Sequence, residues 1–389
     1  MRTIGVVTVA RSDYGIYLPI LRQIQATPDL RLQLFVSGMH LSPEFGLTVT
    51  QIEKDGFEVH ERVEMLLSSD TPEGIAKSVG LGVIGFAQAY ARVRPDILLV
   101  LGDRFEMLSA VVAAMPYTIP IAHIHGGEAT EGLIDEPIRH SITKMSHLHL
   151  VSTKRYRERV IQLGEEPWRV TVSGAPSLDN LQAIKWLDLH SLEAKIDFPL
   201  QPPPLLVTYH PVTLEYQDTE QHISELLAAL EMVDLPIVFT YPNSDTNGRI
   251  IIEAINRFVQ SHERSRAVTN LGTQAYFSLM RHASAMVGNS SSGIIEAASF
   301  GLPVINIGNR QRGRIHSYNV IDVGYDRHSI VQAIREVSKP SFRAQVVGMQ
   351  NPYGDGHAAK RIVKVLGTTP LDRKLILKRF YDITLGETQ

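Results

Sequence analysis

The chain of 389 residues contains no cysteine. This absence excludes disulfide bonds, thiolate catalysis and cysteine-ligated zinc, and a reducing cytoplasm is the compartment that we expect. The chain also has no excess of positive charge, because 38 Lys and Arg are balanced by 41 Asp and Glu and the formal net charge is −3. Nucleic-acid-binding proteins need a basic surface that neutralises phosphates, so we expect no nucleic-acid partner.

Long apolar runs and the common nucleotide fingerprints are missing as well. No apolar stretch approaches the roughly 20 residues that span a bilayer, and the run after Arg2 is too short for a signal peptide, so we expect no membrane partner. Neither a Gly-x-Gly-x-x-Gly after the first strand nor a Walker-type lysine loop occurs, which argues against dinucleotide binding and P-loop NTP hydrolysis. His123, His147 and His149 lack the spacing of zinc ligands, so we expect no metal and no cofactor.

The sequence does contain strand-like apolar runs that alternate with helical patterns. This alternation predicts an α/β protein with parallel sheets covered by helices. The length and the 44% hydrophobic content predict two domains. The best boundary lies between Lys185 and Pro204, where three prolines in a row form a stiff segment. We therefore predict lobes at 1–190 and 204–366, and a C-terminal helix at 367–389 that crosses back to the first lobe.

Several helices have recognisable ends. A helix is expected at about 14–26. Another should begin at 69–73, where a capping side chain, a proline and an acid stand together, and should stop near Val93 because Arg94-Pro95 follows. The last two helices are expected at about 356–366 and 371–383.

Polar residues follow the apolar runs directly, in both halves of the chain. In open α/β sheets, ligands bind beyond the carboxyl ends of the strands. The repetition of this arrangement predicts a ligand cleft between two such sheets. The clusters are Arg11-Ser12-Asp13, Gly102-Asp103-Arg104 and His123 to Glu128 in the first half, and His210, Asn289 to Gly293 and Asn309-Arg310 in the second.

In the second half, three serines follow a strand and open a helix. Their hydroxyls and the exposed N–H groups, at Ser290 and Ser291 above all, predict a phosphate site, although an ordinary serine N-cap is the alternative. Glu296, one turn later, could accept from ribose hydroxyls or complement the helix dipole. Arg310 is the phosphate candidate because it is nearest to its strand, whereas the following arginines are interpreted as a solvated loop.

In the first half, the candidates are titratable groups. His125 and Glu128 flank two glycines that let a ligand approach the backbone, and both can serve in acid–base catalysis. Asp103 stands beside Arg104 at a strand end, where a local ion pair is the alternative. Asp135 and Arg139 are four residues apart, as in an intrahelical pair. His210, in the second half, lies at a strand end as well, although a lone histidine is more often structural.

Together these clusters resemble the hydrolysing UDP-N-acetylglucosamine 2-epimerases of sialic-acid and related nonulosonic-acid synthesis. The resemblance covers nearly the whole chain and implies a GT-B-like α/β fold, with two Rossmann-like parallel-sheet lobes and an interlobe cleft that holds the UDP-sugar. The residues that carry it are Arg11 to Gly15, Ser37 to His40, Gly102 to Phe105, His123 to Glu128, Asp135 with Arg139 to Met145, His210 to Thr213, Gly288 to Gly293 and Val304 to Arg310.

The resemblance also implies a reaction. UDP is eliminated after loss of the C2 proton, a 2-acetamidoglucal forms, and water adds to give N-acetylmannosamine inverted at C2. No metal or redox cofactor is implied, and we expect a homodimer or homotetramer. By position, the family's UDP-binding residues match Arg11, Ser290, Ser291, Glu296 and Arg310, with Arg104 nearby. Its catalytic and sugar-contacting residues match Asp103, Asp135, Arg139 and His210.

Two departures from the family pattern bear on the site, and the substrate stays open. Some branches of the family carry Glu where this chain has His125, and Lys where it has Ile16. Close relatives act on a UDP-2,4-diacetamido-2,4,6-trideoxyglucose, and the motifs do not separate that substrate from UDP-N-acetylglucosamine. A GT-B glycosyltransferase and a non-catalytic nucleotide-sugar-binding protein are two rival functions for the same fold. The carboxylates of Asp103 and Asp135 favour elimination.

Overall fold

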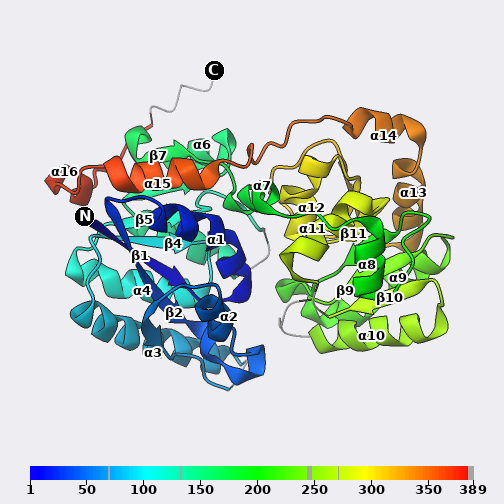
Figure 1. The fold of residues 1–389 in the computed structure, drawn as a ribbon, viewed down its shortest axis with the longest axis horizontal. Helices are drawn as coiled ribbons and strands as arrows, with labels where there is room; N and C mark the ends of the chain where they lie inside the picture. Colours follow the sequence, from blue (N-terminus) through cyan, green and yellow to red (C-terminus); the bar gives the residue numbers. More distant parts are fainter. Residues whose placement is uncertain (69–70, 132–133, 243–247, 270, 384–389) are drawn as a thin grey trace. The chain divides into compact units, whose positions relative to one another are not determined.

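The computed structural model describes residues 1–68, 71–131, 134–242, 248–269 and 271–383. Within these residues the chain divides into two compact units (Figure 1). The first consists of Met1–Glu128, Asp135–Gln182 and Tyr353–Gln389, and the second of Ala129–Ile134 and Ala183–Pro352. Each unit is built on one parallel sheet.

The sheet of the first unit has the strand order β3-β2-β1-β4-β5-β6-β7. All its pairings are parallel; Ile4, for example, lies between Leu32 and Ile97. The strands are β1 (Arg2–Thr8), β2 (Leu30–Ser37), β3 (Val59–Val63), β4 (Ile97–Leu101), β5 (Ile121–Ile124), β6 (Leu148–Val151) and β7 (Val170–Val172). The helices are α1 (Arg11–Gln25), α2 (Val49–Lys54), α3 (Pro72–Arg92), α4 (Phe105–Ala114), α5 (Asp135–Met145), α6 (Lys154–Gln162), α7 (Asn180–Ala183, whose last residue is in the second unit), α15 (Ala358–Thr368) and α16 (Arg373–Ile376).

Both faces of this sheet are buried, which explains why its strands read as continuous apolar runs. In β4, Ile97, Leu99 and Leu101 belong to one core cluster, which also includes residues of α1 and α15. The alternate residues Leu98 and Val100 belong to a second cluster, formed with α3 and α4. The period of two along the strand therefore separates two layers of helices.

Helix ends in this unit agree only partly with the sequence predictions. α3 begins at Pro72, where the Thr71 hydroxyl accepts the N–H of Gly74 at 3.1 Å, and ends at Arg92, as its cap signals predict; residues 69 and 70 lie outside the described residues. α1 begins at Arg11, earlier than predicted.

The predicted helix at 371–383 is wrong, because only α16 forms there. Arg169 is 1% exposed. Its guanidinium donates to the carbonyls of Leu375 at 2.8 Å, Lys374 at 3.0 Å and Leu377 at 3.2 Å. A tertiary arginine therefore satisfies carbonyls that a longer helix would have paired along the chain.

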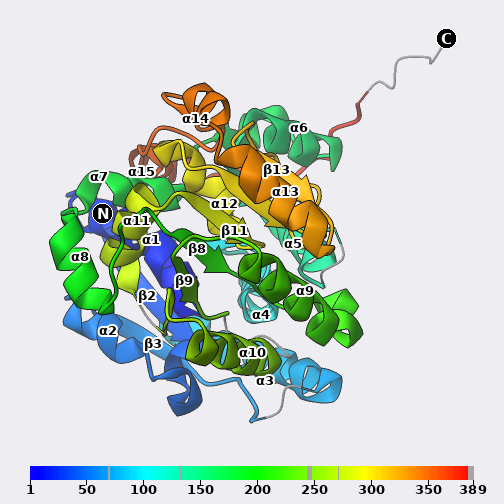
Figure 2. The ribbon, with the colours of Figure 1, turned by 90° about the vertical axis from the view of Figure 1, so that its right-hand side faces the viewer.

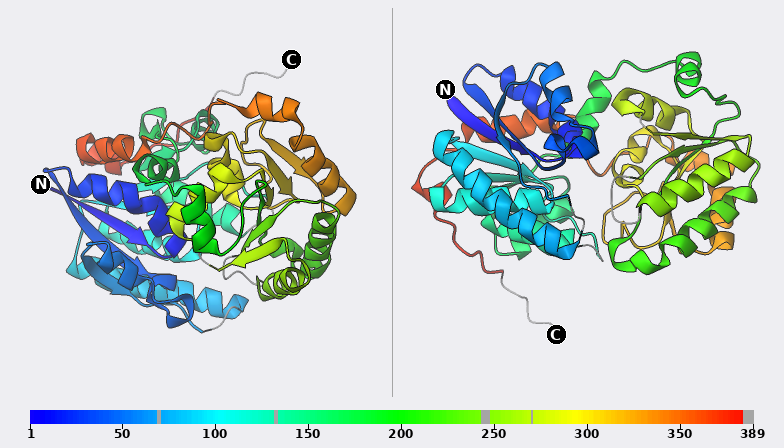
Figure 3. Two further views of the ribbon diagram at one scale, coloured as in Figure 1. Left: turned by 45° about the vertical axis from the view of Figure 1, so that its right-hand side comes forward. Right: turned by 90° about the horizontal axis from the view of Figure 1, so that it is seen from below.

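The sheet of the second unit has the order β10-β9-β8-β11-β12-β13 and is also parallel throughout. Figure 2 faces this unit, and Figure 3 shows both units from two further directions. α9, α10 and α13 share a core cluster with one face of the sheet. The strands are β8 (Leu205–Thr208), β9 (Ile237–Thr240), β10 (Ser265–Val268), β11 (Ala285–Gly288), β12 (Val304–Ile307) and β13 (Val320–Val323). The helices are α8 (Leu189–Ile196), α9 (Thr219–Glu231), α10 (Gly248–Ser261), α11 (Gly272–His282), α12 (Ser291–Ile295), α13 (Arg327–Val337) and α14 (Pro340–Val346).

The chain passes between the units at 128/129, 134/135, 182/183 and 352/353. The predicted boundary segment 185–204 lies in the second unit, where it contains α8 and the prolines that precede β8. Residues from Tyr353 onward belong to the first unit, and α15 packs there against α1. No helix of the described residues has both the length and the hydropathy needed to cross a membrane.

Candidate active site

The predicted polar clusters lie at equivalent places in the two sheets. In each sheet the first strand along the chain, β1 or β8, is an interior strand. It pairs with the fourth strand along the chain, β4 or β11. That pairing is the point where the strand order reverses, and ligands of doubly wound sheets bind beyond the carboxyl ends of the strands there. Arg11 and Asp103 follow β1 and β4, and His210 and Ser290 follow β8 and β11.

Arg139 connects the predicted groups of the first unit. It lies on α5 and is 1% exposed. Its guanidinium forms an ion pair with Asp103, and it donates to Glu136 at 2.6 Å and to the carbonyl of Glu128 at 3.0 Å. Although burial opposes its charge, Asp103 and Glu128 raise the pKa of Arg139. The structure thus brings together Asp103, Glu128 and Arg139, which are distant in the sequence.

His125 and Glu128 form a direct side-chain pair. Nδ1 of His125 lies 2.6 Å from Oε1 of Glu128. The hydroxyl of Ser152, just after β6, lies 3.0 Å from the same nitrogen and donates to the same carboxylate oxygen at 3.2 Å. A carboxylate at Nδ1 favours the tautomer whose Nε2 is an acceptor. Nε2 is buried and makes no hydrogen bond within the described residues.

The backbone around this pair is unusual. His125 has a φ of 65°, in the left-handed region that non-glycine residues rarely adopt. Two residues later, a Cβ on Gly127 would lie 2.5 Å from the carbonyl oxygen of Tyr156, so only glycine fits. Backbone strain of this kind often accompanies functional sites. This left-handed backbone conformation places His125 directly after the end of β5.

Arg104 precedes α4 and forms a local ion pair. Nη2 and Nε donate to Glu106 at 2.9 and 3.1 Å. Asp135, the first residue of α5, is close enough to raise the pKa of Arg104, although burial opposes this effect. Arg11 is exposed at the first residue of α1. The ion pair that we considered as an alternative for Arg104 therefore exists, with Glu106 rather than Asp103 as its carboxylate.

In the second unit, Asn289 connects three of the strand ends. It is fully buried. Its side chain accepts the N–H of His210 at 2.7 Å and donates to the carbonyl of the same residue at 2.8 Å. Its own carbonyl accepts from Arg310 at 3.2 Å and from Gln311 at 2.8 Å. One amide side chain thus fixes His210 and Arg310 relative to the serine turn.

The serine turn differs from the prediction in one respect. The helix that it opens, α12, has only five residues and is followed by a 3₁₀ turn at Ala297–Phe300. Ser290 caps it, accepting the N–H of Ser292 at 3.3 Å. Because so short a helix aligns few peptide dipoles, anion binding here depends on hydroxyls, N–H groups and Arg310 rather than on a macrodipole. Glu296 is buried at its C-terminal end.

Tyr276 is a member of this cluster that the sequence patterns did not reveal. It lies on α11, and its hydroxyl shares hydrogen bonds with the side chains of Ser292, Thr208 and Ser290; burial raises its pKa. Nothing in an amphipathic helix pattern distinguishes such a tyrosine from a core aromatic residue.

His210 is buried, whereas Arg312 is exposed to solvent. His210 is 6% exposed. Burial, with Arg310 acting in the same direction, lowers its pKa well below the usual range, so it is neutral at neutral pH. Arg312 is largely exposed and pairs with Glu131 at 3.2 Å, in agreement with its interpretation as part of a solvated loop.

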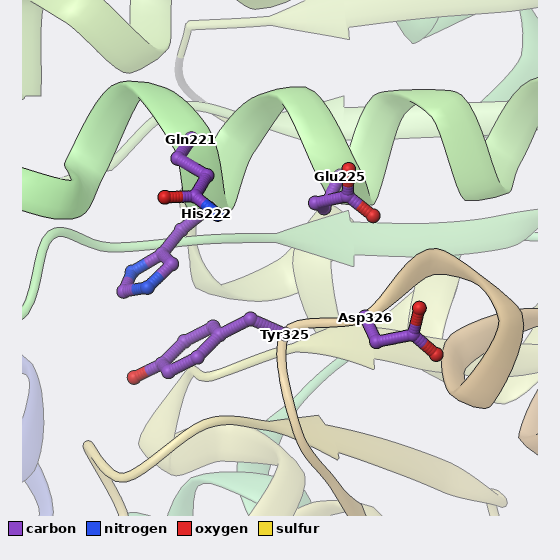
Figure 4. A pocket seen from close by; sticks show the side chains of 5 residues that line it. All are labelled: Gln221, His222, Glu225, Tyr325 and Asp326. Atoms are coloured by element: carbon purple, nitrogen blue, oxygen red, sulfur yellow. The ribbon is translucent and has the colours of Figure 1, made fainter.

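One further histidine and one cavity lie outside the hydrogen-bonded groups described above. Burial lowers the pKa of His123 to about 3, and its Nε2 lies 2.8 Å from the carbonyl oxygen of Gly102. Among the described residues, no group of three or more His, Asp or Glu is arranged to hold a metal ion. A cavity of about 310 Å³ in the second unit is lined by Gln221, His222, Glu225, Tyr325 and Asp326 (Figure 4), and none of these is a predicted site residue.

Comparison with known proteins identifies the family. A sequence profile described as UDP-N-acetylglucosamine 2-epimerase matches residues 22–367. The chain belongs to this family. The resemblance inferred from the motifs is therefore confirmed.

Individual relatives of this 2-epimerase family cover nearly the whole chain. A GDP/UDP-N,N′-diacetylbacillosamine 2-epimerase (hydrolyzing) of Campylobacter jejuni is 38% identical, over 98% of this chain and 99% of its own. A UDP-N,N′-diacetylbacillosamine 2-epimerase (hydrolyzing) of Legionella pneumophila is 36% identical, over 97% and 99%. A UDP-N-acetylglucosamine 2-epimerase of Neisseria meningitidis is 29% identical, over 99% and 100%.

Solved structures of the family share the fold. The UDP-GlcNAc 2-epimerase from Neisseria meningitidis bound to UDP-GlcNAc matches with a TM-score of 0.81 at 17% identity, over 94% of this chain and 99% of that chain. A UDP-N-acetylglucosamine 2-epimerase from Listeria monocytogenes matches with a TM-score of 0.80 at 18% identity, over 94% and 95%. The predicted GT-B-like fold class, with two Rossmann-like parallel-sheet lobes, is confirmed.

Proposed function

We propose that the protein is a hydrolysing 2-epimerase whose substrate is a UDP-2,4-diacetamido-2,4,6-trideoxyglucose. This sugar nucleotide is also called UDP-N,N′-diacetylbacillosamine. The relatives named for this sugar are 36 and 38% identical, whereas relatives named for UDP-N-acetylglucosamine are 24–29% identical. The family resemblance put UDP-N-acetylglucosamine first and this sugar as the alternative, and the motifs did not separate the two. UDP-N-acetylglucosamine is the second candidate, because the family as a whole carries its name.

The proposed reaction has two steps. A base takes the C2 proton, its electron pair forms the C1–C2 double bond, and the C1–O bond breaks to release UDP. Water then adds its hydroxyl to C1 while an acid delivers a proton to C2 from the opposite face. The product is the free 2-epimeric sugar.

The observation that carries this proposal is the His125–Glu128 pair. An imidazole is oriented to accept a proton when its Nδ1 is bound by a carboxylate and its Nε2 has, among the residues that the structure describes, no hydrogen-bond partner. Asp103 and Asp135 are the other proton-transfer candidates, and Arg139 holds Asp103 in place through their ion pair. Within one unit the chain therefore provides more than one titratable group for the two proton transfers.

UDP is assigned to different groups. We propose that Ser290, Ser291, Glu296 and Arg310 bind the nucleotide and its diphosphate, with His210 as a neutral hydrogen-bonding group beside them. Arg11 and Arg104 of the first unit are further candidates for the anionic oxygens. Guanidinium groups form charge-assisted hydrogen bonds with phosphate, so no divalent ion is required to neutralise it.

The test is turnover without an acceptor. The protein is incubated in D₂O with either UDP-sugar, with EDTA present throughout, and UDP release is followed together with the proton NMR of the sugar. We expect UDP and a free manno-configured sugar with deuterium at C2, formed faster from the 2,4-diacetamido substrate. Faster turnover of UDP-N-acetylglucosamine would reverse the substrate assignment. No turnover until an acceptor is added would indicate a glycosyltransferase, and binding without turnover a nucleotide-sugar-binding protein.

A further inference from the structure

Asp13 is a buried carboxyl group that the proposed mechanism does not use. It is the third residue of α1 and is 6% exposed. One oxygen, Oδ1, lies 3.5 Å from the hydroxyl of Ser12, and the carboxyl group also accepts the N–H of Val9. The other oxygen, Oδ2, is buried and has no hydrogen-bond partner within the described residues. A buried oxygen without a partner is costly when the group is charged.

Arg104, whose charge acts on the Asp13 carboxyl group, already has a carboxylate partner. Arg104 uses Nε and Nη2 to bind Glu106, and Nη2 also lies 3.5 Å from the sulfur of Met39. Its Nη1 makes no hydrogen bond to any described residue, and the side chain is 33% exposed. One guanidinium nitrogen is therefore available to an incoming anion.

The other groups that face Asp13 add negative rather than positive charge. Asp103 comes from the loop between β4 and α4, and Glu106 from the first turn of α4. Tyr17, four residues further along α1, is buried, and Asp13 acts electrostatically on its hydroxyl. His40, whose pKa Arg104 also affects, is kept neutral by burial, which lowers its pKa to about 4. An ionised Asp13 would thus make this part of the site more negative and would compete for Arg104.

We propose that Asp13 is a positioning residue for diphosphate binding. When Asp13 is neutral, Nη1 of Arg104 is available to an anionic oxygen of the UDP-sugar. When Asp13 is ionised, it attracts the Arg104 guanidinium and makes Nη1 unavailable to the ligand. The inference rests on the proposed assignment of UDP to this site. It adds that the protonation state of Asp13 controls the affinity for the diphosphate. Asp13 acts through Arg104 and need not touch the substrate.

The titration of Asp13 falls in a range that is easily measured. Burial raises its pKa to about 7, with Glu106 and Asp103 acting in the same direction and Arg104 opposing them. If the ligand binds only the form with neutral Asp13, the apparent Kd increases as that form is depleted. Between pH 6 and pH 8.5 the expected increase is about thirtyfold.

The experiment measures binding of the methyl ester of UDP by calorimetry at pH 6, 7 and 8.5. This probe is esterified at both ends of the diphosphate, so its charge does not change in this range, and it is not a substrate. In the wild-type protein we expect the Kd to increase about thirtyfold. In Asp13→Asn, which keeps an acceptor for Val9, the Kd at pH 6 should match the wild type and should change less than about threefold up to pH 8.5.

Two further variants separate this role from a structural one. Asp55→Asn removes a carboxylate that accepts from the adjacent Tyr14 at 2.6 Å, and it should keep the wild-type pH dependence. Arg104→Gln should bind weakly at all three pH values and lose the pH dependence, because Asp13 then has no guanidinium to control. A pH-independent wild-type Kd, or an Asp13→Asn variant that keeps the wild-type slope, would overturn the proposal. Failure of both UDP-sugars to turn over would overturn the proposed function alone, since the ester reports binding without turnover.

Discussion

Replacing Asp103 by asparagine separates a role in proton transfer from a role in holding Arg139. Asp103 is 24% exposed and pairs with Arg139, which is almost fully buried. A hydrogen bond to a charged group contributes about 1.5–3 kcal/mol, so the substitution should lower the free energy of unfolding by that amount. If Asp103 also transfers a proton, kcat should decrease at least about a hundredfold, the low end for general acid–base catalysis. The affinity for UDP should stay nearly unchanged.

The chain offers a matched control in Glu136. Its side chain is 25% exposed and accepts from the same guanidinium at 2.6 Å, so Glu136→Gln weakens a second carboxylate bond of Arg139. The other oxygen of Glu136 lies 3.0 Å from Nε2 of His140, and this contact changes as well. We expect a similar loss of stability in urea unfolding but less than about a tenfold decrease in kcat, because only Asp103 is assigned a proton-transfer role. Initial rates of UDP release at saturating substrate measure kcat. Equal losses of kcat in the two variants would refute the reasoning and show that Asp103 acts by positioning Arg139.

Three further substitutions test other parts of the site and fold. Arg310→Ala should weaken UDP binding by about 1.5–3 kcal/mol in calorimetry, and unchanged affinity would contradict its assignment to the diphosphate. His125→Gln should lower kcat at least about a hundredfold, whereas a nearly normal rate would make His125 structural. Glu165 is fully buried beside His149 and two lysines, and although burial opposes ionisation, these partners lower its pKa from 4.5 to about 2. A lowered carboxyl pKa gives stability that is present above about pH 4.5 and is lost as the pH falls towards 2. The midpoint temperature of thermal unfolding should therefore be lower for Glu165→Gln than for the wild type at pH 7. Between about pH 4.5 and 2 it should decrease less in the variant than in the wild type.

The strand-end clusters could be predicted from the sequence because their signals are local. Continuous apolar runs, as in β4, mark strands buried on both faces, and the polar residues that follow such a strand lie at the carboxyl edge of a parallel sheet. Asp103, His125 and Arg310 were found in this way. The order of the strands, and thus which clusters lie at the switch point, follows from the regular topology of such folds.

Side-chain partners could not be predicted, because they depend on packing between distant segments. The pairing of Arg139 with Asp103 joins residues 36 positions apart, and the four-residue spacing to Asp135 suggested a different partner. Asn289 was visible only as a neighbour of serines, although it holds His210 and Arg310 in place. The C-terminal helix was predicted too long because a tertiary contact from Arg169 replaces its helical hydrogen bonds.

The chemistry proposed here gives a reason for the different character of the two units. UDP leaves in the first step. Groups that bind the diphosphate therefore assist the elimination, whereas the hydration that follows breaks no bond to the diphosphate. Proton transfer at C2 occurs in both steps, first as removal and then as delivery, so its groups must be able to change protonation state. His210 is held neutral by burial and by Arg310, and it is therefore better suited to hydrogen bonding than to carrying a proton. The His125–Glu128 pair, with Asp103 and Asp135, comes from a part of the chain where carboxylates and an imidazole share hydrogen bonds. The proton-transfer groups are thus expected in the first unit, and the groups whose loss changes mainly KM in the second.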